Sequence, residues 1–326
     1  MLTVTALSPL HQVVTKVIKH CQQALPAFVT GQLLGLDVGK TLEVTHSFPF
    51  PSKEGGGDGD DDSTEYQMEM MRCLRDVNVD NNTVGWYQST YFSSFIDDAC
   101  VETQYNYQSH IKNCVMLIYD PSRSRTSGVA LRAFRLTDAF MRLYSDGKVT
   151  YDALSSANEA DGPTDVFEEV PIRVKSSNLH AALMLELQDE LGIGANASDF
   201  SRLEVNTNPF LEKQLQLLIE SIEDLQQESN RLQHYERSVQ RQKAAQNAYL
   251  AKKKAEAEAR AARGEEPLPE EDLSTNPAFK PIPKPSRLDS LLLSNQMSAY
   301  CRLINQFSGQ SFAKLFLMQS LNATQK

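Results

Sequence analysis

Three observations predict an α/β fold followed by long helices. In the first half of the chain, segments with apolar residues at helical spacing alternate with short runs typical of strands. Beyond residue 208 the strand signals stop, and leucines follow a heptad rhythm typical of helices packed against helices. Prolines then crowd into one stretch before a last amphipathic segment. We therefore expect a domain at 1–176, helices at 177–263, a linker at 264–286 and a C-terminal helix at 287–326.

The composition limits the class of protein. The 326 residues suffice for about two domains, and a hydrophobic content of 41% can supply a buried core. The net charge of -10 argues against nucleic-acid binding over the whole surface, so any RNA contact must be regional. Five scattered cysteines predict neither a disulfide framework nor a zinc knuckle, which favours a reducing compartment. No leader segment and no apolar run of ~18 residues is present, so we expect a soluble protein without membrane contact.

The elements of the α/β domain are expected in a definite order. Ser8 and Pro9 precede an amphipathic helix, and strands at 29–36 and 41–48 form a hairpin. Residues 52–65 contain no apolar side chain and predict a flexible acidic loop. The remaining expected elements are helices at 65–76 and 95–107, strands at 83–87, 114–119, 129–136 and 167–175, and a helix at 178–191.

Two features of the helical region predict contacts with other molecules. The heptad positions form an apolar seam that requires helical partners; they are Leu211, Leu215, Leu218, Ile222, Leu225 and Leu232. The continuation at 231–263 carries nine Lys or Arg against three Glu, a net charge of +6 in an acidic chain. This local reversal makes Lys252, Lys253 and Lys254 candidate RNA contacts, and a solvated projecting helix is the alternative.

Residues 84–90, with the sequence VGWYQST, resemble the signature of the MPN superfamily, whose active members carry Gly-Trp-Tyr-His-Ser-His at the end of a strand. The resemblance implies an MPN (JAB/Mov34-like) domain with a mixed sheet flanked by helices. In active members two histidines and an aspartate hold zinc, a glutamate activates the bound water, and a serine steadies the transition state. Such a centre needs three protein ligands and one open position.

Aligned with the active pattern, this sequence lacks each of these groups. Gln88 and Thr90 stand in place of the two histidines, Val101 in place of the aspartate, Asp98 in place of the serine and Phe28 in place of the glutamate. The six histidines form no recognisable metal-binding pair, and no phosphate-binding loop or nucleophile elbow is found. The resemblance therefore implies a protein that is not an enzyme, with no catalytic residue, metal or cofactor.

Four segments resemble a narrower family, the H subunits of eukaryotic translation initiation factor three. They are YQMEMMR at 66–72, GWYQSTY at 85–91, FEEVP at 167–171 and EPLPEEDL at 266–273. The last is the most specific because it lies outside the MPN domain, and the resemblance extends from residue 10 to residue 320. It implies a cytoplasmic scaffold subunit of a factor that supports 43S pre-initiation complex assembly, binds the small ribosomal subunit and recruits messenger RNA.

The resemblance also implies partners. The MPN domain would pair with the second MPN protein of the factor, its F subunit, and the C-terminal helices would join a bundle with PCI-type subunits. Two alternatives remain open at this point. One is an inactive MPN scaffold of the proteasome lid or the COP9 signalosome, and the other is a deubiquitinating metalloprotease.

Overall fold

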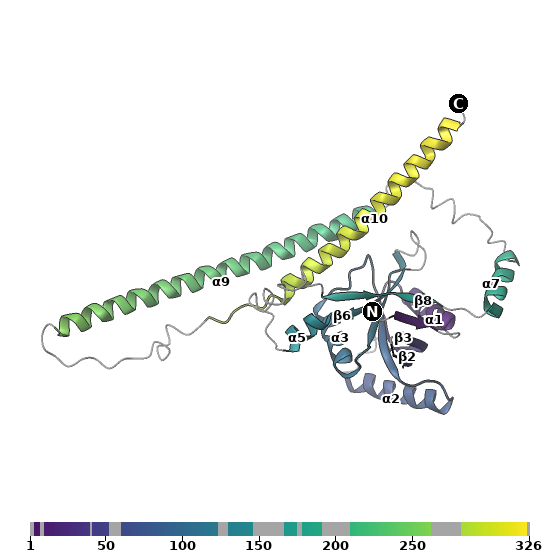
Figure 1. Cartoon of the computed structure of the whole chain (residues 1–326), viewed down its shortest axis with the longest axis horizontal. Coiled ribbons are helices and arrows are strands. Elements are labelled where there is room, and N and C mark those ends of the chain that lie inside the picture. Colours follow the sequence, from purple (N-terminus) through teal and green to yellow (C-terminus); the bar gives the residue numbers. More distant parts are fainter. Residues whose placement is uncertain are drawn as a thin grey trace.

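One mixed sheet lies at the centre of the molecule, and two long helices extend beyond it (Figure 1). The computed structural model describes residues 3–6, 10–39, 41–51, 60–122, 130–145, 166–174, 178–190, 209–261 and 282–324, and all structural statements concern these residues. The strands are β1 (Thr3–Ala6), β2 (Thr30–Val38), β3 (Thr41–Pro49), β4 (Thr83–Ser89), β5 (Val115–Tyr119), β6 (Leu131–Leu136), β7 (Phe167–Val170) and β8 (Ile172–Val174). The helices are α1 (Leu10–Gln23), α2 (Asp60–Asp76), α3 (Asp98–His110), α5 (Asp138–Ser145), α7 (Asn178–Glu190), α9 (Pro209–Ala261) and α10 (Leu288–Thr324).

The sheet has the order β7-β6-β5-β4-β2-β3-β1-β8, with parallel pairs at β4–β5, β1–β3 and β1–β8. Its two edge strands, β7 and β8, are separated in sequence only by Pro171. Because a single residue spans at most about 3.6 Å, the sheet must curl until its two edges meet at this proline. The strand order places β4 and β5 in the interior of this sheet, where side chains on both of their faces are buried.

The central strands divide their side chains between two cores. Val115 and Leu117 of β5 belong to the cluster that includes Val13 and Val17 of α1, whereas Met116 faces the cluster that includes Trp86, Phe95 and Cys100. This strict alternation follows from the two-residue period of a strand. A Cβ at Gly85 would come within 1.9 Å of the Val115 carbonyl oxygen, so only glycine permits the close pairing of β4 with β5.

The long helices are attached to the sheet through α10. Leu292 lies in a third buried cluster with Val101 of α3, Leu136 of β6 and Phe140 of α5. Helix α9 packs along α10 near the domain, and the two then diverge, so that the C-terminal parts of both helices project away from the sheet (Figure 1). Among the described helices, including these two, no stretch has the length and apolar character of a membrane span.

The α/β class, the MPN architecture and the long C-terminal helices are confirmed, but several element boundaries differ. Helix α2 begins at Asp60, so the expected acidic loop is wrong over residues 60–65; the rest of the loop lies outside the described residues. Three consecutive aspartates at its start suit the positive end of the helix dipole. Helix α3 begins three residues later than expected because the Asp97 side chain accepts a 2.8 Å hydrogen bond from the Asp98 N–H and caps the helix.

Two further differences concern strands. The single strand expected at 167–175 is wrong, because Pro171 divides it into β7 and β8 on opposite edges of the sheet. Strand β1, which the sequence pattern does not predict, pairs in parallel with both β3 and β8. Ser8, Pro9 and residues 264–281 of the expected linker lie outside the described residues. The domain boundary at residue 176 stays a prediction.

Candidate functional site

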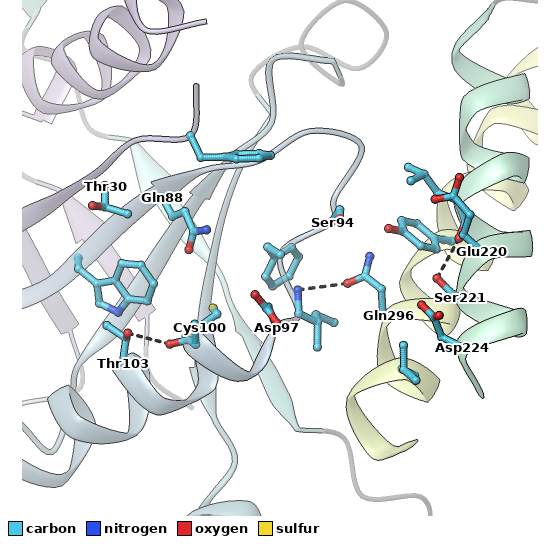
Figure 2. A pocket seen from close by; sticks show the side chains of 18 of the residues that line it. Thr30, Gln88, Ser94, Asp97, Cys100, Thr103, Glu220, Ser221, Asp224 and Gln296 are labelled. Atoms are coloured by element: carbon cyan, nitrogen blue, oxygen red, sulfur yellow. Dashed lines mark hydrogen bonds between the residues drawn. The ribbon is translucent and has the colours of Figure 1, made fainter. Parts of the chain in front are cut away.

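Some of the predicted motif positions line a groove between the sheet and the long helices. Its volume is about 690 Å³, and its walls come from the start of β2, the end of β4, the first half of α3, and α9 and α10 (Figure 2). Of the five motif positions, the structure brings Phe28 and Gln88 to this groove; Thr90, Asp98 and Val101 do not line it. The side chains that line the groove are therefore not those of an assembled ligand set.

The two positions predicted to replace histidines have different surroundings. Gln88 is half-buried on β4, where it pairs with Thr30 of β2 and faces the groove. Thr90 is buried, and its hydroxyl donates a 3.0 Å hydrogen bond to the Ser94 carbonyl oxygen while its N–H donates to the Tyr119 carbonyl oxygen at 2.9 Å. The polar groups of Thr90 are thus already hydrogen-bonded within the fold. The carboxamide of Gln88 is a poor ligand for a transition metal.

The other three positions are equally unsuited to hydrolytic chemistry. Val101 is fully buried and packs against Leu136 and Leu292 in the third core cluster. Asp98 is the exposed first residue of α3. Phe28 is 61% exposed, with its ring 6.0 Å from the Tyr91 ring in an edge-to-face arrangement. Val101 and Phe28 have no group that could accept a proton or bind a metal, and the Asp98 carboxylate does not line the groove.

The groove also lacks an activated nucleophile among its described lining residues. Cys100 lies there, but burial raises the pKa of its thiol to about 12, and its Sγ lies 3.3 Å from the Met116 Sδ. A thiol with such a pKa stays protonated near neutral pH and is a weak nucleophile. Within the part of the chain that the structure describes, no group of three or more His, Cys, Asp or Glu side chains is arranged to hold a metal ion.

The loop between β4 and α3 is held from two sides. Phe92 and Ser93 have φ angles of 53° and 58°, a strained conformation for residues other than glycine. The Asp120 carboxylate accepts hydrogen bonds from the Ser93 N–H at 2.8 Å and the Ser93 hydroxyl at 3.2 Å. From the other side, the Gln296 amide of α10 donates to the Ser93 carbonyl oxygen at 2.9 Å and accepts from the Ile96 N–H at 3.2 Å.

Helix α9 adds a weaker contact to the same loop. The Gln214 amide donates to the Phe92 carbonyl oxygen at 3.4 Å, from a side chain that is almost completely buried. Both long helices therefore reach the segment that leads from the motif strand into α3. Because buried backbone groups are costly to leave unpaired, these amide contacts fix where the helices sit on the domain.

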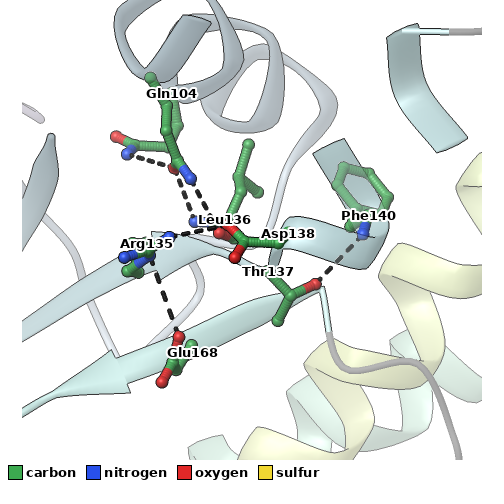
Figure 3. A network of polar contacts seen from close by, with 8 residues as sticks. Gln104, Arg135, Leu136, Thr137, Asp138, Phe140 and Glu168 are labelled. Atoms are coloured by element: carbon green, nitrogen blue, oxygen red, sulfur yellow. Dashed lines mark hydrogen bonds and ion pairs between the residues drawn. The ribbon is translucent and has the colours of Figure 1, made fainter. Parts of the chain in front are cut away.

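A ladder of buried hydrogen bonds begins at Trp86, which lines the groove, and Figure 3 shows its continuation from Gln104 to Leu136. The Trp86 indole N–H donates to the Gln104 Oε1 at 2.8 Å, and the Gln104 amide donates to the Gln108 Oε1 at 3.2 Å. Gln108 then makes hydrogen bonds with both the N–H and the carbonyl oxygen of Leu136, at 3.0 and 2.9 Å. At the end of β6, Arg135 makes an ion pair with Asp138 at 2.9 Å. The ladder orients Trp86 and ties α3 to β6.

The predicted seam on α9 is divided between two faces. Leu211, Leu218, Leu225 and Leu232 are half-buried, and the helix also buries Gln214 and Ser221 on this side. Leu215 and Ile222 instead face outward, together with Ile219; these three side chains are 42%, 46% and 56% exposed. On the projecting end of α10, large apolar side chains are also exposed, namely Phe312, Leu315, Phe316, Leu317 and Met318.

The basic part of α9 projects away from the domain (Figure 1). Lys252 and Lys254 are exposed, and the Lys253 ammonium lies 5.4 Å from the centre of the Tyr249 ring. These three lysines are not near the degenerate motif. Their place on a projecting helix suits a solvated surface and a contact with RNA equally well, so the RNA hypothesis stays a prediction.

Sequence reasoning missed the residues that join the helices to the domain. Gln296, Gln214 and Asp120 carry no motif, and their partners are backbone groups far away in the sequence. One signal was available: Gln296 falls between Leu292 and Tyr300 at four-residue spacing on the apolar stripe of the last helix. A polar residue in such a stripe indicates a buried group that needs a specific partner.

The fold and this groove define the class of the protein as an MPN-type domain with a helical extension. Residues 5–113 match the family model described as JAB1/Mov34/MPN/PAD-1 ubiquitin protease, and residues 125–326 match the model described as the C-terminal region of eIF3h. Relatives that bear the name of the H subunit of eukaryotic translation initiation factor 3 are similar over nearly the whole chain. The one from Arabidopsis thaliana is 49% identical, covering 95% of this chain and 90% of the relative.

Relatives with the same name come from two further organisms. The protein from Nematostella vectensis is 47% identical over 94% of this chain and 91% of its own length, and that from Dictyostelium discoideum is 40% identical over 95% and 92%. The chain belongs to the family of H subunits of eukaryotic translation initiation factor 3. The predicted family is thus confirmed, and a role as a translation initiation factor subunit follows.

The Gln296 contacts generate a stability prediction. Gln296→Leu keeps the size of the side chain but leaves the Ser93 carbonyl and the Ile96 N–H without their partner, so we expect a loss of about 2 kcal/mol or more in the free energy of unfolding. Urea denaturation followed by the fluorescence of Trp86, the single tryptophan, measures it. Asn305→Leu, at an exposed position of the same helix, is the matched control and should change stability little. Equal stability of the two variants would contradict the assignment.

Proposed function

We propose that this chain is a non-catalytic scaffold subunit of translation initiation factor 3. In this role it supports 43S pre-initiation complex assembly, small ribosomal subunit binding and messenger RNA recruitment in the cytoplasm. The observation that carries the proposal is the apolar surface left open on the long helices, at Leu215, Ile219 and Ile222 of α9 and at the projecting end of α10. Exposed apolar surface of this extent is typical of a chain that assembles with others.

The absence of catalysis is part of the proposal. In an active MPN enzyme the metal ligands must converge on one open position, but here Gln88 and Thr90 offer an amide and an engaged hydroxyl, and Val101 lies in the core. Helices α9 and α10 also cover part of the groove, and they contribute Leu217, Leu293 and Tyr300 to its lining. Membership of the family favours the initiation-factor scaffold over a subunit of the proteasome lid or COP9 signalosome, and over a deubiquitinating enzyme.

We assign different partners to the MPN domain and to the long helices. We propose that the MPN domain pairs with the F subunit of the factor and that the open apolar surfaces of α9 and α10 join helices of PCI-type subunits. Burying one leucine or isoleucine is worth roughly 1.5–3 kcal/mol, so three together on α9 would outweigh any single surface ion pair. Leu218 and Leu225, which are half-buried within the chain, contribute mainly to internal packing.

A substitution on the open face of α9 tests the assembly. Changing Leu215, Ile219 and Ile222 together to Asp places charges in the proposed interface while sparing the half-buried side of the helix. We expect the variant to fold and to lose co-purification with PCI-type subunits in tagged-complex mass spectrometry. The matched control changes the exposed Gln226, Gln227 and Asn230 to Asp, and this variant should assemble normally. Normal assembly of the first variant would remove the basis of the proposal.

Zinc content and ubiquitin cleavage test the proposal that the chain is not an enzyme. The full chain, loaded with excess zinc and then dialysed, should contain far less than one equivalent by elemental analysis and should cleave no ubiquitin chain, because the motif positions provide no three-ligand site. Gln88→Ala is the control, and it should leave the zinc content unchanged. One equivalent of zinc that this variant removes, or cleavage that a chelator abolishes, would overturn the proposal.

The basic arm of α9 supports a second, weaker proposal, a contact with RNA on the ribosome. Replacing Lys252, Lys253 and Lys254 with Glu should lower ribosome association and flatten its dependence on salt, because each phosphate contact releases counterions. The control replaces the exposed Lys16, Lys19 and Lys112 of the α/β domain with Glu, which gives the same change in charge elsewhere. Ribosome sedimentation at several salt concentrations measures the effect, and identical profiles for both variants would exclude the arm as an RNA contact.

A further inference from the structure

The groove between the sheet and the long helices has a lining that suits a positively charged ligand. Three carboxylates line it, those of Asp97, Glu220 and Asp224, and its described lining contains no Lys, Arg or His. Asp97 comes from the cap of α3, whereas Glu220 and Asp224 lie one turn apart on α9, so two independent elements direct negative charge at one space (Figure 2).

These carboxylates are not neutralised within the described part of the chain. Asp97 accepts a hydrogen bond from the Asp98 N–H, and Glu220 accepts one from the Gln216 amide at 3.2 Å, but neither has a cationic partner there. Asp224 has no hydrogen bond or ion pair among the described residues. The three side chains are exposed, so water screens their mutual repulsion in part, and a cation that entered the groove would reduce it further.

Aromatic rings form a further part of the lining. Phe28 is exposed at the groove and Phe50 and Tyr107 are half-buried there, whereas Trp86, Phe95 and Tyr300 contribute almost completely buried rings. A guanidinium or ammonium group gains from the faces of aromatic rings as well as from carboxylates, and an apolar side chain beside it can pack against the rings. RNA does not fit this lining, because its phosphates would meet three carboxylates.

We propose that this groove binds an extended segment of a partner protein that carries arginine next to an apolar side chain. The volume of about 690 Å³ lies within the range typical of small-ligand sites and suits two or three side chains rather than a whole helix. The site is separate from the open apolar surfaces of α9 and α10. The inference therefore goes beyond the scaffold role and does not depend on it.

Trp86 provides a reporter, because it is the single tryptophan and lies in the groove wall. The probe is the capped peptide Gly-Ser-Phe-Arg-Arg-Ser, titrated into the full chain at low salt while the tryptophan emission is recorded. We expect a saturable change in emission that weakens as salt is added. The peptides Gly-Ser-Phe-Glu-Glu-Ser and Gly-Ser-Gly-Arg-Arg-Ser should bind much more weakly, since the first has the wrong charge and the second lacks the apolar side chain.

Charge reversal on α9 tests whether the peptide binds in this groove. Glu220→Lys with Asp224→Lys should weaken the peptide about tenfold or more, as expected for two removed attractions and two added repulsions. The matched control is Glu212→Lys with Glu223→Lys, two exposed carboxylates of the same helix that do not line the groove, and it should bind within about twofold of the parent chain. If the double reversal fails to fold, Glu220→Gln with Asp224→Asn keeps the shapes of both side chains and tests the same charges.

Each outcome of the peptide titrations either supports or overturns the proposal. Binding that depends on arginine, on the phenylalanine and on the two α9 carboxylates supports the proposal. No saturable change in Trp86 emission, equal binding of the glutamate peptide, or equal binding by the charge-reversed variant overturns it. An emission change with oligouridylate but none with the arginine peptide also overturns it. Because the assembly test uses a different face of α9, failure of one proposal would leave the other standing.

Discussion

The molecule depends on the attachment of α10 to the loop that leads from β4 into α3. At this point the Gln296 amide pairs with two backbone groups of the loop, and Leu292 enters the core one turn earlier on the same helix. The loop contains two residues in the left-handed region, a conformation that persists only where its surroundings hold it. Asp120 on one side and Gln296 on the other provide that restraint. The position of α10 then determines where α9 lies.

This attachment explains how the residues at the degenerate motif positions serve the fold. Val101 joins the cluster that receives Leu292, and the Thr90 hydroxyl stabilises the turn at Ser94. A metal ligand must keep its lone pairs directed at an open space, whereas a core residue must fill space and leave no polar atom unpaired. Side chains that satisfy the second requirement cannot meet the first. In this structure Val101 packs with Leu292 of the helical extension, and Thr90 supports the loop that the extension contacts.

The same arrangement distributes charge unevenly along the molecule. The groove beside the attachment point is acidic, through Asp97, Glu220 and Asp224, while the far end of α9 is basic. On another face of the same helix, Leu215, Ile219 and Ile222 are exposed and form an apolar surface. One helix thus carries three surfaces of different chemistry, and each suits a different class of partner. The rigid attachment through α10 keeps the acidic and apolar surfaces in a fixed relation to the sheet.

The sequence by itself determined the class of fold and the family, because these depend on residue identities and local periodicity. Heptad spacing located α9, but it could not separate Leu218, which is half-buried within the chain, from Leu215, which faces outward. The split of residues 167–175 into two edge strands also escaped prediction, because it depends on how the whole sheet curls. Only the tertiary structure decided the site: Gln296 and Ser93 are 203 positions apart, and Asp97 and Asp224 line one groove from the start of α3 and from α9. Contacts such as that of Gln296 leave no local pattern, since what selects them is the cost of leaving buried polar groups without partners.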